Sequence, residues 1–287
     1  MNRRQRLRQL VNRKQGLIVP GAYDGVSAKL VERAGFPVAY MTGYGVSASR
    51  LGLPDMGFAG LGDMADQARN MAGAVSIPLI ADADTGYGNA LNVRRTVALY
   101  ESAGVAGLHL EDQQMPKRCG HLAGKIVVSA EEFAAKIRAA VEARTDPDFV
   151  IIARTDAIAV NGLDDALRRA EAAVKAGADM LFVEAPTTEE QIERVARAFD
   201  TPLLFNYAPG GRSPLPPFAR LRELGYAVIL LPVDTLFVAA GAIQSFLREL
   251  KEGDAALPLA DRYIPFQEFN ELIGVPEQFT LGQHYSA

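Results

Sequence analysis

Eight short segments of the chain are almost continuously apolar and recur along its length. Within them polar residues do not alternate with apolar ones, which is typical of strands buried on both faces in a parallel sheet. These segments span residues 16–24, 38–43, 78–84, 107–112, 149–156, 180–186, 202–209 and 227–234. The pattern therefore predicts eight parallel β-strands.

The sequence between most of these segments favours helices. In residues 130–144 and 163–178, good helix formers predominate and apolar side chains lie three and four positions apart. Several helical stretches end in a glycine just before the next strand, as at Gly104 and Gly177. Eight strand–helix units of this length predict a (β/α)8 TIM barrel. An open doubly wound sheet is the alternative, but no G-x-G-x-x-G follows the first strand.

One barrel domain accounts for most of the chain, and we expect residues 1–287 to form a single domain with a C-terminal helical extension from about residue 252 to 287. The extension carries aromatic residues that a barrel does not need. We therefore expect it to dock onto the barrel or onto a neighbouring subunit.

Composition excludes several classes of protein. A net charge of −4 gives no reason to expect a nucleic-acid partner, and no apolar run is long enough for a membrane span. The basic start of the chain lacks the apolar core of a signal peptide, so we interpret it as an exposed first helix, with a transit peptide as the alternative. A single cysteine fits a reducing, cytoplasmic location.

Acidic and polar residues gather where the predicted strands end. Because the carboxyl ends of barrel strands meet at one mouth, these side chains should face one another there. Like charges repel unless a cation neutralises them, and Mg²⁺ prefers carboxylate oxygens. We expect a metal at Asp82, Asp84 and Glu111, because Asp82 and Asp84 face the same side of a strand. His109 alternates with apolar neighbours and is interpreted as a core histidine.

The only cysteine, Cys119, lies in a long, basic connection after the fourth strand, which is typical of an active-site lid. Neighbouring cations such as Lys117 and Lys125 would lower the pKa of this thiol and attract an anion. Cys119 is therefore a candidate general acid or base, or a nucleophile; an incidental exposed cysteine is the alternative.

Five motifs, DADTGYGN (82–89), GLHLEDQ (107–113), KRCGH (117–121), IIARTDA (151–157) and FVEAP (182–186), resemble in order and spacing the isocitrate lyase / phosphoenolpyruvate mutase superfamily. K-[KR]-C-G-H resembles the lid of its carbon–carbon bond lyases. The resemblance implies a TIM barrel whose last helix is exchanged between subunits, a homotetramer built as a dimer of dimers, and Mg²⁺ or Mn²⁺ as cofactor.

The resemblance also implies roles for individual residues. Asp82 and Asp84 correspond to the metal-site acids, with Asp55 and Glu111 as water-mediated partners, and Cys119 to the catalytic cysteine. Arg154 would stabilise negative charge as the bond breaks, with Glu111 nearby. The implied substrate contacts are Thr42, Gly43, Tyr44, Asp55, Gly120, His121, Arg154, Glu184 and Asn206.

Two departures bear on the substrate, which we expect to be a small anionic carboxylic acid. Methylisocitrate lyases carry two arginines where this chain has Phe237 and Phe269. An extra carboxylate needs a cation, so the change favours a smaller substrate, although Arg212 could compensate partly and Asp234 could repel a second carboxylate. The turn at 206–215 resembles the 2,3-dimethylmalate lyase and oxaloacetate hydrolase branch.

The sequence therefore predicts a Mg-dependent carbon–carbon lyase that cleaves a 2-hydroxy or 2-oxo dicarboxylate of the 2-alkylmalate or oxaloacetate type through an enolate. The alternatives are a phosphonate-processing enzyme of the carboxyvinyl-carboxyphosphonate phosphorylmutase type, a methylisocitrate lyase, and an oxaloacetate decarboxylase. A non-catalytic barrel is disfavoured, because an inert scaffold has no use for a buried cluster of acids.

Overall fold

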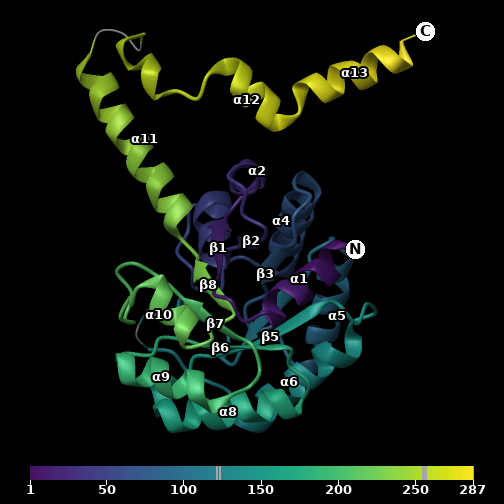
Figure 1. Cartoon of the computed structure of the whole chain (residues 1–287), viewed down its shortest axis with the longest axis vertical. Helices are drawn as coiled ribbons and strands as arrows, with labels where there is room; N and C mark the ends of the chain where they lie inside the picture. Colours follow the sequence, from purple (N-terminus) through teal and green to yellow (C-terminus); the bar gives the residue numbers. More distant parts are fainter. Residues whose placement is uncertain (121, 123, 254–256, 287) are drawn as a thin grey trace. The chain divides into compact units, whose positions relative to one another are not determined.

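The computed structural model describes residues 1–120, 122, 124–253 and 257–286. Eight parallel strands close into a barrel in chain order, with β1 paired to both β2 and β8 (Figure 1). The strands are β1 Leu17–Ala22, β2 Ala39–Met41, β3 Leu79–Asp82, β4 Gly107–Glu111, β5 Val150–Thr155, β6 Met180–Val183, β7 Leu203–Asn206 and β8 Val228–Leu231. Each lies within one of the eight apolar segments, so the predicted (β/α)8 TIM barrel is confirmed.

Helices follow the strands in the order that the sequence indicates. They are α1 Arg3–Asn12, α2 Gly25–Arg33, α3 Gly43–Val46, the π-helical turn η1 Ser47–Leu51, α4 Leu61–Ala74, α5 Ala90–Ser102, α6 Ala130–Ala143, α7 Ile158–Asn161, α8 Leu163–Lys175, α9 Glu189–Ala198 and α10 Phe218–Glu223. The helices predicted over 130–144 and 163–178 are present as α6 and α8, and each ends slightly earlier than expected.

The strands are buried on both faces because two apolar cores meet at the sheet. One core fills the barrel interior, and the larger one lies between the strands and the surrounding helices. Helix α1 belongs to the interior core, where Leu7 and Val11 pack with Val38 and Val150. Val38 lies just before the start of β2 and Val150 lies at the start of β5, so α1 covers the N-terminal end of the barrel. The predicted first helix is therefore less exposed than expected.

The C-terminal part of the chain, Thr235–Ala287, forms a separate compact unit from Met1–Asp234. It contains the helices α11 Asp234–Glu252, η2 Leu257–Arg262, α12 Phe266–Ile273 and α13 Val275–Tyr285. Within it the rings of Phe246 and Tyr263 pack 5.5 Å apart, and Arg262 pairs with Glu249 at 2.7 Å. The expected single domain, the exchanged helix and the tetramer stay predictions. Across the described ranges, each helix is too short or too polar to span a bilayer.

Candidate active site

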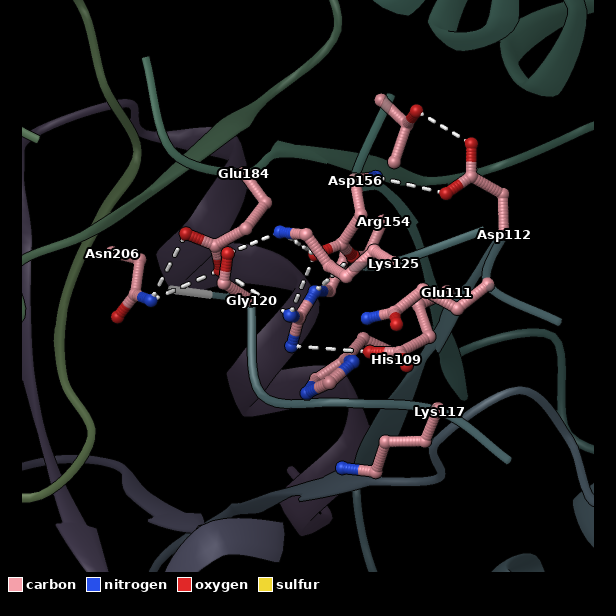
Figure 2. Close-up of polar contacts among 12 residues, drawn as sticks. His109, Glu111, Asp112, Lys117, Gly120, Lys125, Arg154, Asp156, Glu184 and Asn206 are labelled. Carbon is pink, nitrogen blue, oxygen red and sulfur yellow. Dashed lines mark hydrogen bonds and ion pairs between the residues drawn. The ribbon is translucent and has the colours of Figure 1, made fainter. Parts of the chain in front are cut away.

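The carboxyl ends of the strands bring the predicted polar residues to one mouth of the barrel. Asp82 ends β3, Glu111 ends β4 and Asn206 ends β7, while Arg154 lies one residue before the end of β5. Strand pairing places Glu111 directly beside Arg154. With Glu184 just after β6, residues from five neighbouring strands lie at one end of the barrel. Figure 2 shows Glu111, Arg154, Glu184 and Asn206 among them.

An acidic cluster occupies the side of the mouth near β2 and β3. Asp55, Asp82 and Asp84 are all at least nine-tenths buried. The Asp84 amide donates to Asp82 Oδ1 at 2.9 Å, which fixes the turn after β3. Gly43 approaches so closely that a Cβ there would lie 2.4 Å from Asp82 Oδ2. A side chain at position 43, in the loop that we expect to hold a substrate carboxylate, would therefore displace the Asp82 carboxylate.

A lysine from the connection after β4 enters this acidic cluster. The Lys117 ammonium contacts Asp55 Oδ1 and lies 2.6 Å from Asp84 Oδ1. Its side chain is 3% exposed. The sequence marked Lys117 only as part of a basic lid, and the structure shows that it neutralises two of the predicted metal-site acids directly.

Burial and charge set the protonation of the acids in opposite directions. Burial raises the pKa of Asp84 to about 7, although Lys117 opposes the shift. Burial also acts to raise the pKa of Asp82, but His109, Lys117 and Arg154 outweigh it and lower the pKa to about 2. Burial raises the pKa of Glu111 well above its usual range, with Arg154 opposing. The pocket thus holds more carboxyl groups than its cations can keep ionised.

His109 supports this cluster from inside the barrel. The ring is fully buried, its Nε2 lies 2.7 Å from the Tyr40 hydroxyl, and burial lowers its pKa to about 4. The imidazole is therefore neutral at pH 7, so the charges that keep Asp82 ionised there come from Lys117 and Arg154. The interpretation of His109 as a core histidine agrees with this environment.

Arg154 is the central cation on the other side of the mouth. Its guanidinium donates to Asp156 from Nε at 2.9 Å and from Nη2 at 3.2 Å, and Nη1 lies 3.3 Å from Glu111 Oε2. It also lies over the ring of Phe182. Burial acts to lower the pKa of Arg154, but Asp156, Glu111 and Glu184 outweigh this effect and raise the pKa well above its usual value. The guanidinium is therefore always charged.

Glu184 and Asn206 complete this side of the mouth. Asn206 Nδ2 donates to Glu184 Oε2 at 3.0 Å, and Glu184 Oε2 lies 3.5 Å from Arg154 Nη2. Asp112, by contrast, does not face the mouth group. It accepts from the Thr155 hydroxyl at 2.7 Å and the Asp156 amide at 2.8 Å, so its carboxylate braces the end of β5.

The described part of the lid segment, residues 113–120, 122 and 124–128, brings Cys119 to the mouth. An antiparallel bridge between Gln113 and Val127 closes its base, and the Gln114 amide donates to the Ile126 carbonyl at 2.8 Å. At its tip the Cys119 amide donates to the Asp55 carbonyl at 3.1 Å, which brings the half-buried thiol residue beside the acidic cluster.

The structure thus gathers the predicted residues Asp55, Asp82, Asp84, Glu111, Cys119, Gly120, Arg154, Glu184 and Asn206 around one mouth. Thr42 is the N-cap of α3, where its hydroxyl accepts from the Gly45 amide. Gly43 and Tyr44 are the first two residues of that helix. His121 lies outside the described residues. Sequence reasoning missed the roles of Lys125 and Asp156, whose ion pair is described below.

The acids of the mouth are the candidate ligands for a metal ion. Across the described ranges, no three His, Cys, Asp or Glu side chains are arranged to hold a metal ion, and Lys117 stands among the acids. The chemistry of the set nevertheless suits a hard cation, because it consists of carboxylates. In the described part of the chain, the buried Glu111 Oε1 has no hydrogen-bond partner. Such an oxygen fits a metal-bound water or a ligand.

Comparison with known proteins gives the family. Residues 7–251 match the model of the phosphoenolpyruvate phosphomutase family. The chain belongs to this family. It is 44% identical over 286 residues to 2,3-dimethylmalate lyase of Eubacterium barkeri, covering 100% of this chain and 99% of that protein. It is 41% identical to the chloroplastic carboxyvinyl-carboxyphosphonate phosphorylmutase of Arabidopsis thaliana, covering 98% of this chain and 84% of that one.

Solved structures agree. A 2,3-dimethylmalate lyase described as a PEP mutase/isocitrate lyase superfamily member superposes with a TM-score of 0.94 at 37% identity, covering 100% of this chain and 96% of that one. Oxaloacetate acetylhydrolase with 3,3-difluorooxalacetate gives 0.92 at 40% identity (98% and 96% covered). Phosphonopyruvate hydrolase with oxalate and Mg²⁺ gives 0.91 at 31% identity (100% of both).

These similarities confirm the superfamily that the five motifs resembled. The protein is therefore an enzyme of that superfamily, a lyase or mutase with a TIM-barrel fold. The roles of individual residues in its mouth stay predictions.

Proposed function

We propose that this enzyme is a Mg²⁺-dependent carbon–carbon lyase that cleaves a 2-hydroxy or 2-oxo dicarboxylate of the 2-alkylmalate or oxaloacetate type. The observation that carries the proposal is the juxtaposition of three buried acids, the buried Arg154 and a cysteine-bearing lid at one mouth. Similarity to 2,3-dimethylmalate lyase and to oxaloacetate acetylhydrolase supports this substrate class.

The acids of the mouth suit a divalent cation and a chelating substrate. Asp82, Asp84, Asp55 and Glu111 would hold Mg²⁺ directly or through water, and Mn²⁺ has the same ligand preference. When bound, the cation supplies Lewis acidity that lowers the pKa of a substrate hydroxyl and polarises the carbonyl that forms from it. A neighbouring structure that holds oxalate and Mg²⁺ supports this part of the proposal.

Arg154 and Cys119 would carry out the steps that the protein's own groups perform. In a 2-hydroxy acid, the C2 hydroxyl proton would pass to a carboxylate of the mouth as the bond between C2 and C3 breaks, so that C2 becomes the carbonyl of a 2-oxo acid and the electron pair moves into an enediolate of the leaving carboxylic acid. A 2-oxo acid such as oxaloacetate would first add water at C2, and the same cleavage would then leave oxalate. The permanently charged Arg154 stabilises the developing negative charge in a site without bulk water. The Cys119 thiol then donates its proton to the carbanion, which yields the second product.

The roles of the remaining residues follow from their positions. Gly43 leaves its backbone close to Asp82, where the Gly43 N–H group at the start of α3 can bind a substrate carboxylate. Glu184 and Asn206 form a polar wall beside Arg154 that would orient the substrate's second end.

A substrate panel with Mg²⁺ tests the proposal. We expect turnover with 2,3-dimethylmalate or oxaloacetate, weaker turnover with 2-methylisocitrate, and loss of turnover in Cys119→Ala. Turnover that is unchanged in Cys119→Ala would remove the thiol from the mechanism.

A phosphonate-processing enzyme is the second candidate, because the chain is 41% identical to the Arabidopsis phosphorylmutase. Phosphorus NMR of phosphonopyruvate incubated with the enzyme separates the two candidates. Conversion of phosphonopyruvate without cleavage of any malate derivative would favour the second candidate and overturn the first.

A further inference from the structure

Lys125 is a buried cation in the lid segment that the proposed chemistry does not use. Its side chain is 1% exposed, and its ammonium donates to the Gly120 carbonyl and, at 3.1 Å, to Asp156 Oδ1. Burying an ammonium costs free energy unless its hydrogen bonds are satisfied, so a lid lysine held in this way needs both partners.

The first partner, Gly120, is the residue that follows Cys119 at the tip of the lid. A Cβ on Gly120 would lie 2.6 Å from Arg154 Nη2 and 2.7 Å from Glu184 Cγ. The backbone at the tip is therefore pressed against the two side chains that face the substrate space. The Lys125 ammonium donates to the carbonyl of this same residue (Figure 2).

The second partner, Asp156, also orients Arg154. One carboxylate accepts from Arg154 Nε at 2.9 Å and from Lys125 Nζ at 3.1 Å. Asp156 is itself fixed, because its amide donates to Asp112 Oδ1 at 2.8 Å. Lys125 thus joins the tip of the lid to the same rigid group that sets the direction of the guanidinium.

The base of the lid has separate attachments. The Val128 amide donates to the Asp112 carbonyl at 2.9 Å, Arg169 donates to the Val128 carbonyl at 2.6 Å, and the Gln113–Val127 bridge lies nearby. Loss of the Lys125 ammonium would leave these contacts in place. The lysine therefore controls the tip of the lid rather than its fold.

We propose that Lys125 is a positioning residue. Its contacts with the Gly120 carbonyl and with Asp156 hold the lid tip closed and fix the position of Cys119 relative to Arg154. This inference rests on the proposed role of Cys119 for its effect on turnover. Its effect on lid position does not depend on that role.

The test uses Cys119 as a reporter, since it is the only thiol in the chain. The rate of Cys119 alkylation by iodoacetamide is measured against pH in the wild-type enzyme and in Lys125→Met. The limiting rate, at which the thiol is fully ionised, is then compared between the two proteins. Extrapolation to the thiolate removes any change in the thiol's ionisation from the comparison. We expect the limiting rate to rise by about tenfold or more, because a hydrogen bond to a charged group is lost.

Turnover provides the second readout. Lys125→Met should lower kcat by about 100-fold, the effect expected when a reacting group is displaced by about 1 Å. Lys125→Arg keeps the charge and should recover part of the loss. Lys175→Met on α8, which removes an exposed lysine paired only locally with Glu171, should change neither rate. If Lys125→Met fails to fold, Lys125→Gln replaces it in both measurements.

The outcomes separate the inference from the proposed function. An unchanged limiting alkylation rate in a folded Lys125→Met protein overturns the inference. Faster alkylation with unchanged kcat supports Lys125 as the group that closes the lid but contradicts the catalytic role of Cys119. Faster alkylation with reduced kcat and partial recovery in Lys125→Arg supports both.

Discussion

The two ends of the barrel both carry buried or half-buried charges, but they satisfy them differently. At the N-terminal end, Glu101 accepts from the amides of Thr145 and Asp146 at 2.9 and 2.7 Å and from Arg4 at 3.4 Å. Asp179 is held in the same way, because it accepts from the Ile151 amide at 2.9 Å and pairs with two arginines. Each of these two carboxylates has at least one backbone donor and a cation.

At the carboxyl end, Asp84 and Glu111 lack such a complement. Asp84 has its pKa raised to about 7 by burial, and in the described chain the Glu111 carboxylate has a cation beside it but no hydrogen-bond donor. The cation between Asp55 and Asp84 comes from Lys117, on a connection rather than on a strand. The charges at the N-terminal end therefore serve stability. The mouth keeps carboxyl groups that have too few donors and cations, and a bound cation or ligand can supply these.

Removing divalent cations gives the largest expected effect. Because the mouth acids would hold Mg²⁺, enzyme treated with EDTA and desalted should lose essentially all turnover, and added Mg²⁺ should restore it. The measurement is initial rate with the best substrate of the panel. Full activity after exhaustive chelation would mean that the acids of the mouth are structural, like those at the other end.

Replacing the thiol gives the next largest effect. Cys119→Ser should lower kcat by about 10²–10⁴-fold, the range for loss of a general acid. The melting temperature should change little, because Cys119 is half-buried and lies on the lid. Steady-state kinetics and a thermal melt check the two parts, and a collapse in melting temperature would point to a structural thiol instead.

The Lys117 ammonium and a divalent cation are alternative partners for the acids of the mouth. Its ammonium and a divalent cation would compete for Asp55 and Asp84, so Lys117→Met should tighten Mn²⁺ binding by about tenfold, within the usual range of coupling between two ligands. Titration of Mn²⁺ followed by electron paramagnetic resonance measures this. Weaker binding in the variant would show that the lysine assists the metal instead of excluding it.

At the N-terminal end, Arg4→Met should destabilise the fold without affecting catalysis. Arg4 is partly exposed and Glu101 keeps its two amide donors, so the free energy of unfolding should fall by only about 1–2 kcal/mol. Denaturant unfolding measures the change, and kcat should stay at the wild-type value. A loss of turnover would break the division of roles between the two ends.

The sequence predicted the barrel because eight apolar segments carry the same signal for strands buried on both faces, and every strand lies within its segment. It predicted the residues at the mouth because strand ends converge in any such barrel. Asp112 follows Glu111 in the sequence, but successive strand residues face opposite sides, and Asp112 braces β5 instead.

The lid shows where sequence reasoning stops. Its connection has no periodicity, so nothing in the sequence indicated that Lys117 reaches Asp84 or that Lys125 turns back to the Gly120 carbonyl. Such contacts depend on the path of the backbone through a long loop. A buried lysine in a polar segment carries no sequence signal that distinguishes it from an exposed one.

The central claim is that the acids at the mouth hold one divalent cation while those at the other end hold none. Mn²⁺ titration with detection by electron paramagnetic resonance, on the wild type, Asp82→Asn and Glu101→Gln, tests it most directly. We predict one bound Mn²⁺ per chain in the wild type and in Glu101→Gln, and its loss in Asp82→Asn. Absence of bound Mn²⁺ in the wild type, or unchanged binding in Asp82→Asn, would contradict the claim.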